Sequence, residues 1–242
     1  MTLAIMQPYF LPYIGYWQLI AAVDVFVVYD NIKYTKKGWI NRNRMLVNGQ
    51  DKIFTLPLKG DSDHLDVVQR ELAADYDRRK LLNQFAGAYR RAPYFEQTWP
   101  LLETVIQYED NNLFRYILHS IEQLCSYLGI GTRIQVSSGI PIDHSLKAQD
   151  KVLAICEALG ATTYINAIGG TELYDGAAFA NRGVELRFIK ARPFEYPQFD
   201  AAFVPWLSII DLLMFNATYE VVRILSECEH IMCNGNNITL SR

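Results

Sequence analysis

The 242-residue sequence predicts an α/β fold, with a mostly parallel, Rossmann-like sheet, an inserted β-hairpin and a helical middle segment. Two stretches, residues 1–30 and 132–190, alternate between apolar strand patterns and helix patterns. Between them, residues 75–128 place apolar side chains at helical spacing. We therefore expect one domain over residues 1–242, with a helical subdomain at about 75–128.

The opening of the chain predicts a βαβ unit. Leu3–Met6 is an apolar run that ends before Pro8, and proline lacks the amide that a central strand needs. Residues 12–22 carry the apolar spacing of a helix, and Val25–Tyr29 is a second apolar run that ends at Asp30. Two such strands lie parallel and side by side, with a right-handed crossover between them.

A hairpin and a run of helices are expected next. Asn48-Gly49 is a pair typical of tight turns, so residues 39–47 and 52–58 should form the two arms of the hairpin. Residues 65–72 have the pattern of another short strand. The clearest amphipathic pattern in the chain covers residues 113–128. Two further helices are expected, at 76–89 and 95–108.

The second half of the chain is expected to add three parallel strands to the sheet. It then continues through an aromatic, proline-containing loop at 192–197 to two helices, at 206–215 and 219–228. The last residues are polar and carry little ordering signal. The three strands and the helices between them are expected at 132–136, 145–159, 162–165, 171–181 and 184–190.

Composition and charge exclude several classes of partner. A net charge of −3 gives no electrostatic footprint for nucleic acid or for an anionic membrane surface. No apolar run reaches the roughly 18 residues of a membrane-spanning helix, and the start lacks the basic segment of a secretion signal. We therefore expect a cytoplasmic protein with no membrane span. The four cysteines have neither metal-ligand spacing nor the pattern of a disulfide framework.

Four polar loops follow strands of the predicted sheet, at residues 7–12, 30–44, 137–144 and 166–175. The carboxyl ends of parallel strands meet at one edge of a sheet, and ligands bind outside that edge. We therefore expect these loops, which lie far apart in the sequence, to border one cleft.

Three residues of the first two loops are candidates for contact with a substrate. The Gln7 amide could bind a sugar hydroxyl or a substrate amide, or it could only cap neighbouring backbone. Tyr9 offers an aromatic ring of the kind that suits flat or sugar-like ligands. Asp30 is placed to act as a general base or to bind an amine or a metal ion, and the alternative is a carboxylate that only holds a turn.

The loop after Asp30 also carries candidate anion-binding groups. Lys36 and its neighbouring lysines could hold a phosphate, although a solvated lysine-rich loop is an equal alternative. Asn41 and Arg42 form a better anion site, because a strand fixes the guanidinium fork. The alternative for Arg42 is a structural ion pair.

Polar and small residues also follow two strands of the second half. Ser137 and Ser138 lie between a strand and a helix, where hydroxyls and backbone amides suit a phosphate, although serine and glycine are also common in turns. Asn166 has the equivalent position in the next loop. The glycines that follow it, Gly169 and Gly170, allow a ligand to approach the backbone closely.

Four other polar residues complete the candidate site. Tyr174 and Asp175 fall in the following short helix, where they could orient a substrate or only complete packing. His144 is the histidine best placed for proton transfer, and a helix-capping surface histidine is the alternative. Asp211 lies in an apolar helix, and a buried carboxylate needs a partner. We expect that partner to be an arginine, a lysine or a ligand amine.

Strings of uncommon residues occur near both ends of the chain. They include Met-Gln-Pro-Tyr-Phe-Leu-Pro-Tyr from Met6, Lys-Lys-Gly-Trp-Ile-Asn-Arg from Lys36, Ile-Asn-Ala-Ile-Gly-Gly from Ile165 and Val-Pro-Trp-Leu-Ser-Ile-Ile-Asp from Val204. Together they resemble the WbqC-like protein family over essentially the whole chain. The resemblance implies a place in the biosynthesis of bacterial O-antigen (lipopolysaccharide), of related surface polysaccharides or of secondary metabolites.

The resemblance also implies an enzyme that modifies an amino sugar carried on a nucleotide. We interpret the reaction as acyl or aminoacyl transfer to the sugar amine, from a donor on coenzyme A or on an acyl carrier protein. Asp30 or His144 would then be the base. Gln7 and backbone amides near Gly169 would stabilise the oxyanion, and loop cations such as Lys36 would bind the diphosphate.

Two alternatives belong to other classes of protein. The segment Tyr13-Ile-Gly-Tyr16, which follows a strand and opens a helix, is similar to the His-x-Gly-His element of nucleotidylyltransferases. That similarity favours nucleotidyl or adenylyl transfer, but tyrosines replace both of the histidines that hold phosphates in that element. The other alternative is a non-catalytic binding protein of the same pathway.

Overall fold

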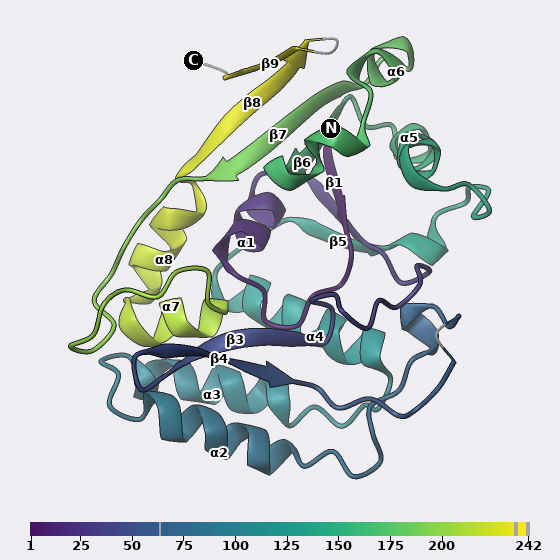
Figure 1. Cartoon of the computed structure of the whole chain (residues 1–242). Helices are drawn as coiled ribbons and strands as arrows, with labels where there is room; N and C mark the ends of the chain where they lie inside the picture. Colours follow the sequence, from purple (N-terminus) through teal and green to yellow (C-terminus); the bar gives the residue numbers. More distant parts are fainter. Residues whose placement is uncertain (63, 235–236, 241–242) are drawn as a thin grey trace.

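A computed structural model describes residues 1–62, 64–234 and 237–240 of the chain. Within that range it contains a seven-stranded sheet and a separate two-stranded sheet, surrounded by helices (Figure 1). The first five strands of the large sheet are parallel, and the last two are antiparallel, so the predicted fold class is confirmed. In spatial order the strands are β5 (Arg133–Val136), β2 (Val25–Val28), β1 (Thr2–Met6), β6 (Thr163–Ala167), β7 (Glu185–Ala191), β8 (Cys228–Asn234) and β9 (Asn237–Leu240).

Strand β1 lies in the middle of the parallel strands, with β2 on one side and β6 on the other. Its side chains alternate between the two faces of the sheet, as the pleat of a strand requires. Leu3 and Ile5 belong to the buried cluster on one face, and Ala4 belongs to the cluster on the other. The chain therefore leaves β1 at Gln7, near the centre of the carboxyl edge.

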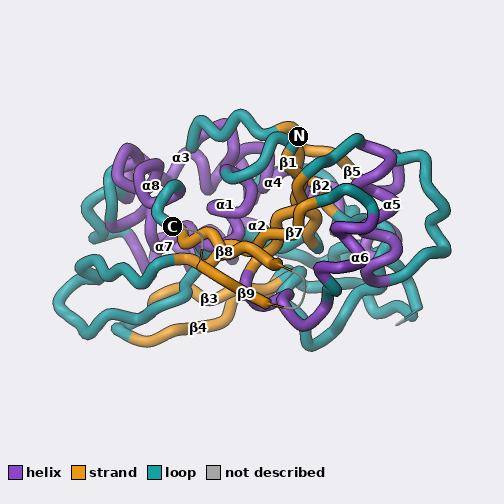
Figure 2. Tube along the Cα trace, turned by 90° about the horizontal axis from the view of Figure 1, so that it is seen from above, coloured by secondary structure: helices purple, strands orange, loops and turns teal. Residues whose placement is uncertain are grey.

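Helices cover both faces of this sheet (Figure 2). On one face, Val152 and Phe179 bring α5 and α6 into the buried cluster. On the other face, α1 packs beside α8, and the buried Gln18 amide donates to the carbonyl of Ile224 at 2.9 Å. No helix within the described residues is long and apolar enough to cross a membrane. The four helices are α1 (Ile14–Ala21), α5 (Ala148–Leu159), α6 (Gly176–Asn181) and α8 (Thr218–Leu225).

The predicted hairpin and helical middle segment pack together below the large sheet (Figure 1). Asn48 and Gly49 have φ of 53° and 75°, so the hairpin turn has the two positive φ angles that such a turn requires. Trp17, Phe54 and Ile117, from α1, the hairpin and the last of these helices, belong to one buried cluster. These three elements therefore share one core. The elements are β3 (Arg42–Val47), β4 (Gln50–Thr55), α2 (Arg78–Tyr89), α3 (Phe95–Ile106) and α4 (Leu113–Tyr127).

Two predicted elements of the middle and second half are wrong in type or extent. Residues 65–72 contain the 3₁₀ turn η1 (Val67–Gln69) rather than a strand, because Asp66 and Gln69 cap each other's backbone. The predicted helix at 171–181 divides into the 3₁₀ helix η3 (Ile168–Leu173) and α6.

The end of the chain differs most from the prediction. The helix expected at 206–215 is shorter and is α7 (Ile209–Phe215), whose first turn is capped by the Ser208 hydroxyl. The helix expected to reach Cys228 ends at Leu225, and the tail forms β8 and β9. Strand β8 pairs along β7 and so satisfies backbone groups that an open sheet edge would expose. Residues 235–236 and 241–242 lie outside the described range.

Side chains from distant elements hold the loop that follows β1. Leu11 in this loop has φ of 47°, which is uncommon for a residue other than glycine. Its carbonyl accepts hydrogen bonds from the Asn43 amide of β3 and, at 2.8 Å, from the Ser208 hydroxyl. The Ser208 N–H in turn donates to the carbonyl of Arg44 at 2.9 Å. Because a buried carbonyl without a donor costs free energy, these contacts fix the loop.

We expect Asn43→Ala to lower the free energy of unfolding by about 1–3 kcal/mol, because it removes a buried donor from the loop carbonyls. The measurement is urea unfolding, followed by circular dichroism. Asn83→Ala, the same change at an exposed position of α2, is the control and should stay within about 0.5 kcal/mol of wild type. Equal stability of the two variants would contradict a supporting role for Asn43.

Candidate functional site

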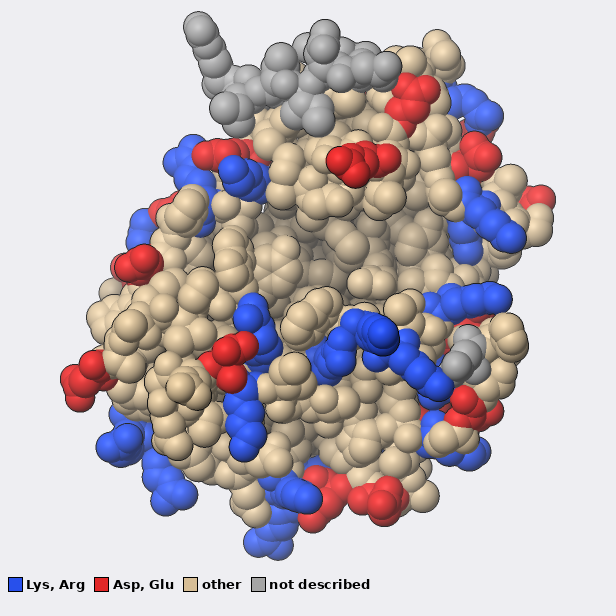
Figure 3. All heavy atoms as spheres, viewed as in Figure 1, with Lys and Arg blue, Asp and Glu red and all other residues tan. Residues whose placement is uncertain are grey.

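One large cleft, of about 1270 Å³, lies at the carboxyl ends of β1, β2 and β6. The space-filling view shows a hollow on this face of the molecule, with Lys and Arg side chains along part of its margin (Figure 3). All four predicted loops contribute to the lining, as the parallel sheet requires. The polar lining residues are Gln7, Tyr29, Asn31, Lys33, Asp66, His144, Ser145, Lys147, Gln149, Lys151, Asn166 and Tyr174.

Gln7 and Gly169 leave room for a ligand in this cleft. The Gln7 side chain is exposed, and its amide makes no hydrogen bond to any other described residue. A Cβ atom added to Gly169 would meet nothing within 4 Å, so the fold does not require glycine at this position. Both positions are exposed and border the open space of the cleft.

Asn166, Gly170 and Tyr174 form a more rigid wall of the same cleft. A Cβ atom at Gly170 would lie 2.8 Å from Asn166 Nδ2, so the close approach of this amide requires glycine. Asn166 Oδ1 accepts the backbone N–H of Ala167 at 2.7 Å. The Tyr174 hydroxyl lies 3.2 Å from that of Tyr164, and burial raises the pKa of Tyr174.

Asp30, Ser137 and Ser138 do not line the cleft; the first two are buried, and Ser138 is exposed elsewhere. Asp30 is only 3 % exposed, and its Oδ1 accepts the Ser137 hydroxyl at 2.8 Å and the Ser138 N–H at 2.9 Å. These bonds join the end of β2 to η2 (Ser137–Gly139), the 3₁₀ turn after β5. The carboxylate therefore holds two loops in register below the cleft.

Asn31 connects His144 to Lys151. Its Nδ2 donates to His144 Nδ1 at 2.9 Å, and its Oδ1 accepts from Lys151 Nζ at 3.1 Å. His144 Nε2 lies 3.0 Å from the carbonyl of Ile140, which can only accept, so this nitrogen carries the proton. Both ring nitrogens of His144 are therefore engaged, and neither can accept a substrate proton in this conformation.

Lys151 of α5 was not among the candidates that the sequence predicts. It is 6 % exposed, lines the cleft and places Nζ 5.2 Å from the ring centroid of Tyr29. Burial lowers the pKa of its amine, and the charges of Asp66 and Asp30 oppose that shift. Among the described residues, no carboxylate oxygen lies within 4 Å of Nζ. The sequence did contain a signal for this residue. Lys151 lies one helical turn before the buried Ile155 and is therefore on the same face of α5.

Tyr9 lies outside the cleft, in a second hollow of about 290 Å³. We call this hollow the aromatic recess, and Tyr9, Tyr13, Trp39, Arg44 and Trp206 line it. Trp206 has φ of 61° and is 54 % exposed. A positive φ in a bulky residue costs on the order of 1–3 kcal/mol and is found mainly at functional sites. The sequence pattern around 206 predicted a buried helix and therefore missed this residue.

The side chains of the predicted anion site, Asn41 and Arg42, make structural hydrogen bonds within the protein. Asn41 is 5 % exposed, and its side chain accepts from Tyr34 and donates to the backbone. The Arg42 guanidinium donates to the carbonyls of Lys37 and Gly38. Arg42 therefore holds the turn that presents Trp39, and neither residue lines the cleft.

Lys36 and Asp175 also lie outside the cleft lining. Lys36 is exposed, and Asp175 caps α6 by accepting the Ala177 N–H at 3.0 Å. Their roles in substrate binding remain predictions. Within the residues that the structure covers, no group of three or more His, Cys, Asp or Glu side chains is arranged to hold a metal ion.

The prediction that Asp211 pairs with a cation is wrong. The carboxylate is fully buried and accepts the Tyr89 hydroxyl at 2.8 Å, the Tyr196 hydroxyl at 2.6 Å and the Gln198 amide at 2.7 Å. Three neutral donors therefore replace a positive charge. Burial raises the pKa of Asp211, although these hydrogen bonds oppose the shift. Asp211 ties α7 to α2 and to the loop before it, away from the cleft.

The polar cleft lies at the carboxyl edge of the parallel strands, which is where ligands of such sheets generally bind. The chain belongs to the WbqC-like protein family, whose model matches residues 7–222, so the predicted family is confirmed. It is similar to the uncharacterized protein Rv1507c of Mycobacterium tuberculosis (strain ATCC 25618 / H37Rv), with 27 % identity over 228 residues. That match covers 93 % of this chain and 97 % of Rv1507c. No solved structure matches the chain significantly.

We expect the stability of wild type to fall relative to that of Asp211→Asn as the pH rises above 4. Because the raised pKa means that the folded state holds the Asp211 proton more tightly, its ionisation destabilises the fold. Urea unfolding between pH 4 and pH 7 measures the difference. Asp75→Asn, at an exposed carboxylate, controls for the change in net charge. Parallel pH profiles for wild type and Asp211→Asn would contradict this assignment.

Proposed function

We propose that this protein transfers an acyl or aminoacyl group to the amine of a nucleotide-linked amino sugar. The observation that carries the proposal is the cleft of about 1270 Å³, whose lining combines side-chain amides, an exposed glycine backbone and a buried lysine. Pockets for one small ligand span about 300–1,000 Å³. A transferase must hold two substrates at once, and this cleft has room for both.

The reaction sets two requirements for the site. The sugar amine attacks the thioester carbonyl of the donor, so that a carbon–nitrogen bond forms, the carbon–sulfur bond breaks and a thiolate leaves. The attacking amine loses a proton, which requires a base. The carbonyl oxygen becomes negative in the transition state, which requires fixed hydrogen-bond donors.

Lys151 is the group best placed to accept the proton. Burial lowers the pKa of its amine, which increases the neutral fraction available as a base near neutral pH. Asn31 orients the amine through its carbonyl, at 3.3 Å, and its Oδ1, at 3.1 Å. His144 and Asp30, which the sequence suggested as bases, would then act as positioning residues for Asn31 and its loop.

Gln7 is the proposed donor to the oxyanion. Its amide is exposed in the cleft and makes no hydrogen bond to another described residue, so a carbonyl oxygen could accept from it without breaking an existing bond. The backbone at Gly169 borders the same space, and no Cβ shields it. These donors lie at the ends of β1 and β6, whereas Lys151 approaches from α5.

Family membership supports a role in the assembly of O-antigen or a related surface glycan. Sugar nucleotides, acyl-coenzyme A and acyl carrier proteins occur together in the cytoplasm, so we place the reaction there. The donor is coenzyme A or a carrier protein in this proposal, because both present an acyl group as a thioester.

Nucleotidyl transfer is less well supported. The analogous element in nucleotidylyltransferases places two histidines against the phosphates. Here the second position is Tyr16, which is 5 % exposed and whose hydroxyl donates to the Gln7 carbonyl at 3.0 Å. This side chain supports the loop and does not face a ligand, which counts against nucleotidyl transfer.

The test is mass spectrometry of UDP- and dTDP-linked amino sugars incubated with the protein and with acyl-coenzyme A or an acylated carrier protein. We expect one sugar nucleotide to gain the mass of the acyl group and to lose its free amine. Transfer of a nucleotide from ATP instead would support the second candidate. Binding of the sugar nucleotide without turnover by any donor would support a non-catalytic binding protein.

Lys151→Met should lower kcat by about 100-fold or more, because a general base contributes 10²–10⁴-fold to such a step. Lys151→Arg, which keeps the charge but cannot act as a base at neutral pH, should be equally impaired. Lys80→Met, at an exposed lysine of α2 outside the cleft, should stay close to wild type. Steady-state rates, with thermal unfolding to check folding, give the comparison. An active Lys151→Arg enzyme would rule out Lys151 as the base.

A further inference from the structure

The aromatic recess is separate from the polar lining of the cleft and differs from it in chemistry. Two tryptophans, Trp39 and Trp206, are 38 % and 54 % exposed, which is unusual for such large apolar side chains. The Tyr13 ring meets Trp206 edge-on at 6.0 Å, and the Tyr9 ring lies 6.4 Å from that of Trp39. The recess therefore presents flat aromatic surfaces to solvent.

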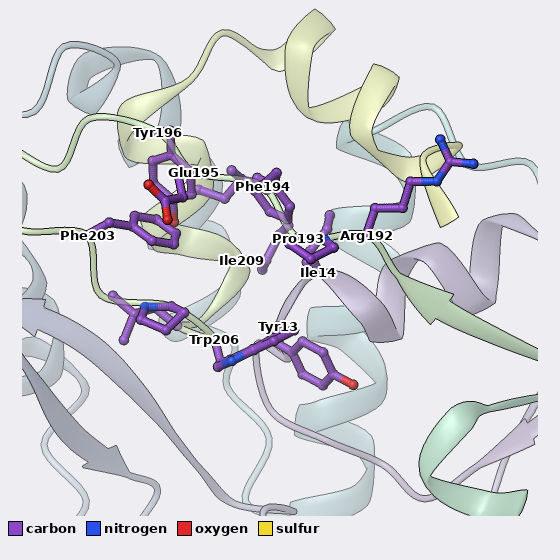
Figure 4. Close-up of a pocket in the computed structure, with 13 residues that line it drawn as sticks. Tyr13, Ile14, Arg192, Pro193, Phe194, Glu195, Tyr196, Phe203, Trp206 and Ile209 are labelled. Carbon is purple, nitrogen blue, oxygen red and sulfur yellow. The ribbon is translucent and has the colours of Figure 1, made fainter. Parts of the chain in front are cut away.

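The position of Trp206 is fixed by specific contacts. Its φ is 61°, and its carbonyl accepts from the Arg44 guanidinium at 3.0 Å. The close-up shows its indole beside Tyr13, at the edge of an adjoining apolar pocket of about 250 Å³ that also contains Phe203 and Tyr196 (Figure 4). A strained backbone that exposes a tryptophan does not add to the core, so the arrangement indicates a surface prepared for a ligand.

Positive charge lies beside these rings. The guanidinium carbons of Arg42 and Arg44 lie 5.4 Å and 5.9 Å from the ring centroid of Trp39. Arg44 is paired with the Asp51 carboxylate at 3.2 Å and also donates to the Trp206 carbonyl, whereas Arg42 donates to two loop carbonyls. Each guanidinium thus uses two of its five N–H groups and retains donors for a phosphate. Flat rings next to arginine forks suit a ligand that joins a planar base to a phosphate group.

The recess and the cleft are close enough to share one ligand. Tyr9 of the recess follows Gln7 of the cleft by two residues, so their Cα atoms lie at most about 7 Å apart. We infer that the aromatic recess binds the nucleoside diphosphate end of the sugar nucleotide, with the base against Trp206 or Trp39 and the diphosphate near Arg44. This inference rests on the proposed function, because it places the amino sugar in the cleft.

The donor arm fits the recess less well. The pantetheine arm, which coenzyme A and acyl carrier proteins share, is flexible and not planar, so it gains little from stacking surfaces. Coenzyme A also carries an adenosine diphosphate end with the same chemistry as a nucleoside diphosphate, and a carrier protein does not. A nucleobase gains stacking on the exposed ring faces, and its diphosphate gains the remaining N–H groups of Arg44, which lines the recess. The large cleft therefore remains for the sugar amine and the thioester.

Calorimetric titration with UDP, dTDP and GDP, which carry no sugar, tests the site directly, and ADP stands for the nucleotide end of coenzyme A. Tighter binding of ADP than of the other three would assign the recess to the donor and overturn the inference. We expect UDP, dTDP or GDP to bind wild type, and Trp206→Ala to weaken that binding by about tenfold or more. Trp206→Phe keeps a flat ring and should restore most of the affinity. Tyr219→Ala removes an aromatic ring that is 72 % exposed on α8, outside the recess, and should leave the affinity unchanged.

The outcomes separate this inference from the proposed function. Equal affinity of wild type and Trp206→Ala for the nucleoside diphosphate would overturn the recess as its site. Acyl transfer to the sugar nucleotide without any binding of nucleoside diphosphates would also overturn it, while the proposed function would stand. Failure of every sugar nucleotide to bind or to be acylated would overturn both.

Discussion

The structure around the site depends on one constraint: the polar backbone that leaves the central strand β1 must find hydrogen-bond partners in a buried environment. Asn43 and Ser208, from the hairpin and from the start of α7, provide donors to the carbonyl of Leu11. Trp17 Nε1 donates to the carbonyl of Pro12 at 3.0 Å. Elements more than 150 residues apart in the sequence are thereby joined at a single loop.

That junction explains why two different surfaces lie next to each other. On one side of the loop, Gln7 faces a polar cleft bordered by β6 and α5. On the other side, Tyr9 faces the aromatic recess formed with the hairpin and with Trp206. A substrate with one polar, reactive end and one flat, charged end matches this pair of surfaces. The fixed loop between them would keep the two ends in register.

The sequence predicted those features that follow from the sheet alone. Parallel strands place Gln7, Asn166 and Gly169 at one edge, whatever their separation along the chain. The sequence could not show which polar side chains turn inward. In the structure, Asp30 is buried beneath the cleft, whereas Lys151 lines it. The hydrogen-bond partners of buried groups could not be predicted from the sequence either. Asp211 accepts from two tyrosines and a glutamine rather than pairing with a cation. The polar tail formed β8 because β7 had an open edge.

Hydrogen–deuterium exchange with a bound sugar nucleotide tests the central claim most directly, because it reports every region that one ligand covers. The account predicts slower exchange in residues 7–9 and 166–174 of the cleft and, in the same complex, in residues 39–44 and 206–208 of the recess. Protection confined to the distant hollow formed by residues 128–132 and 222–230 would contradict it, since that hollow shares no lining residue with either surface.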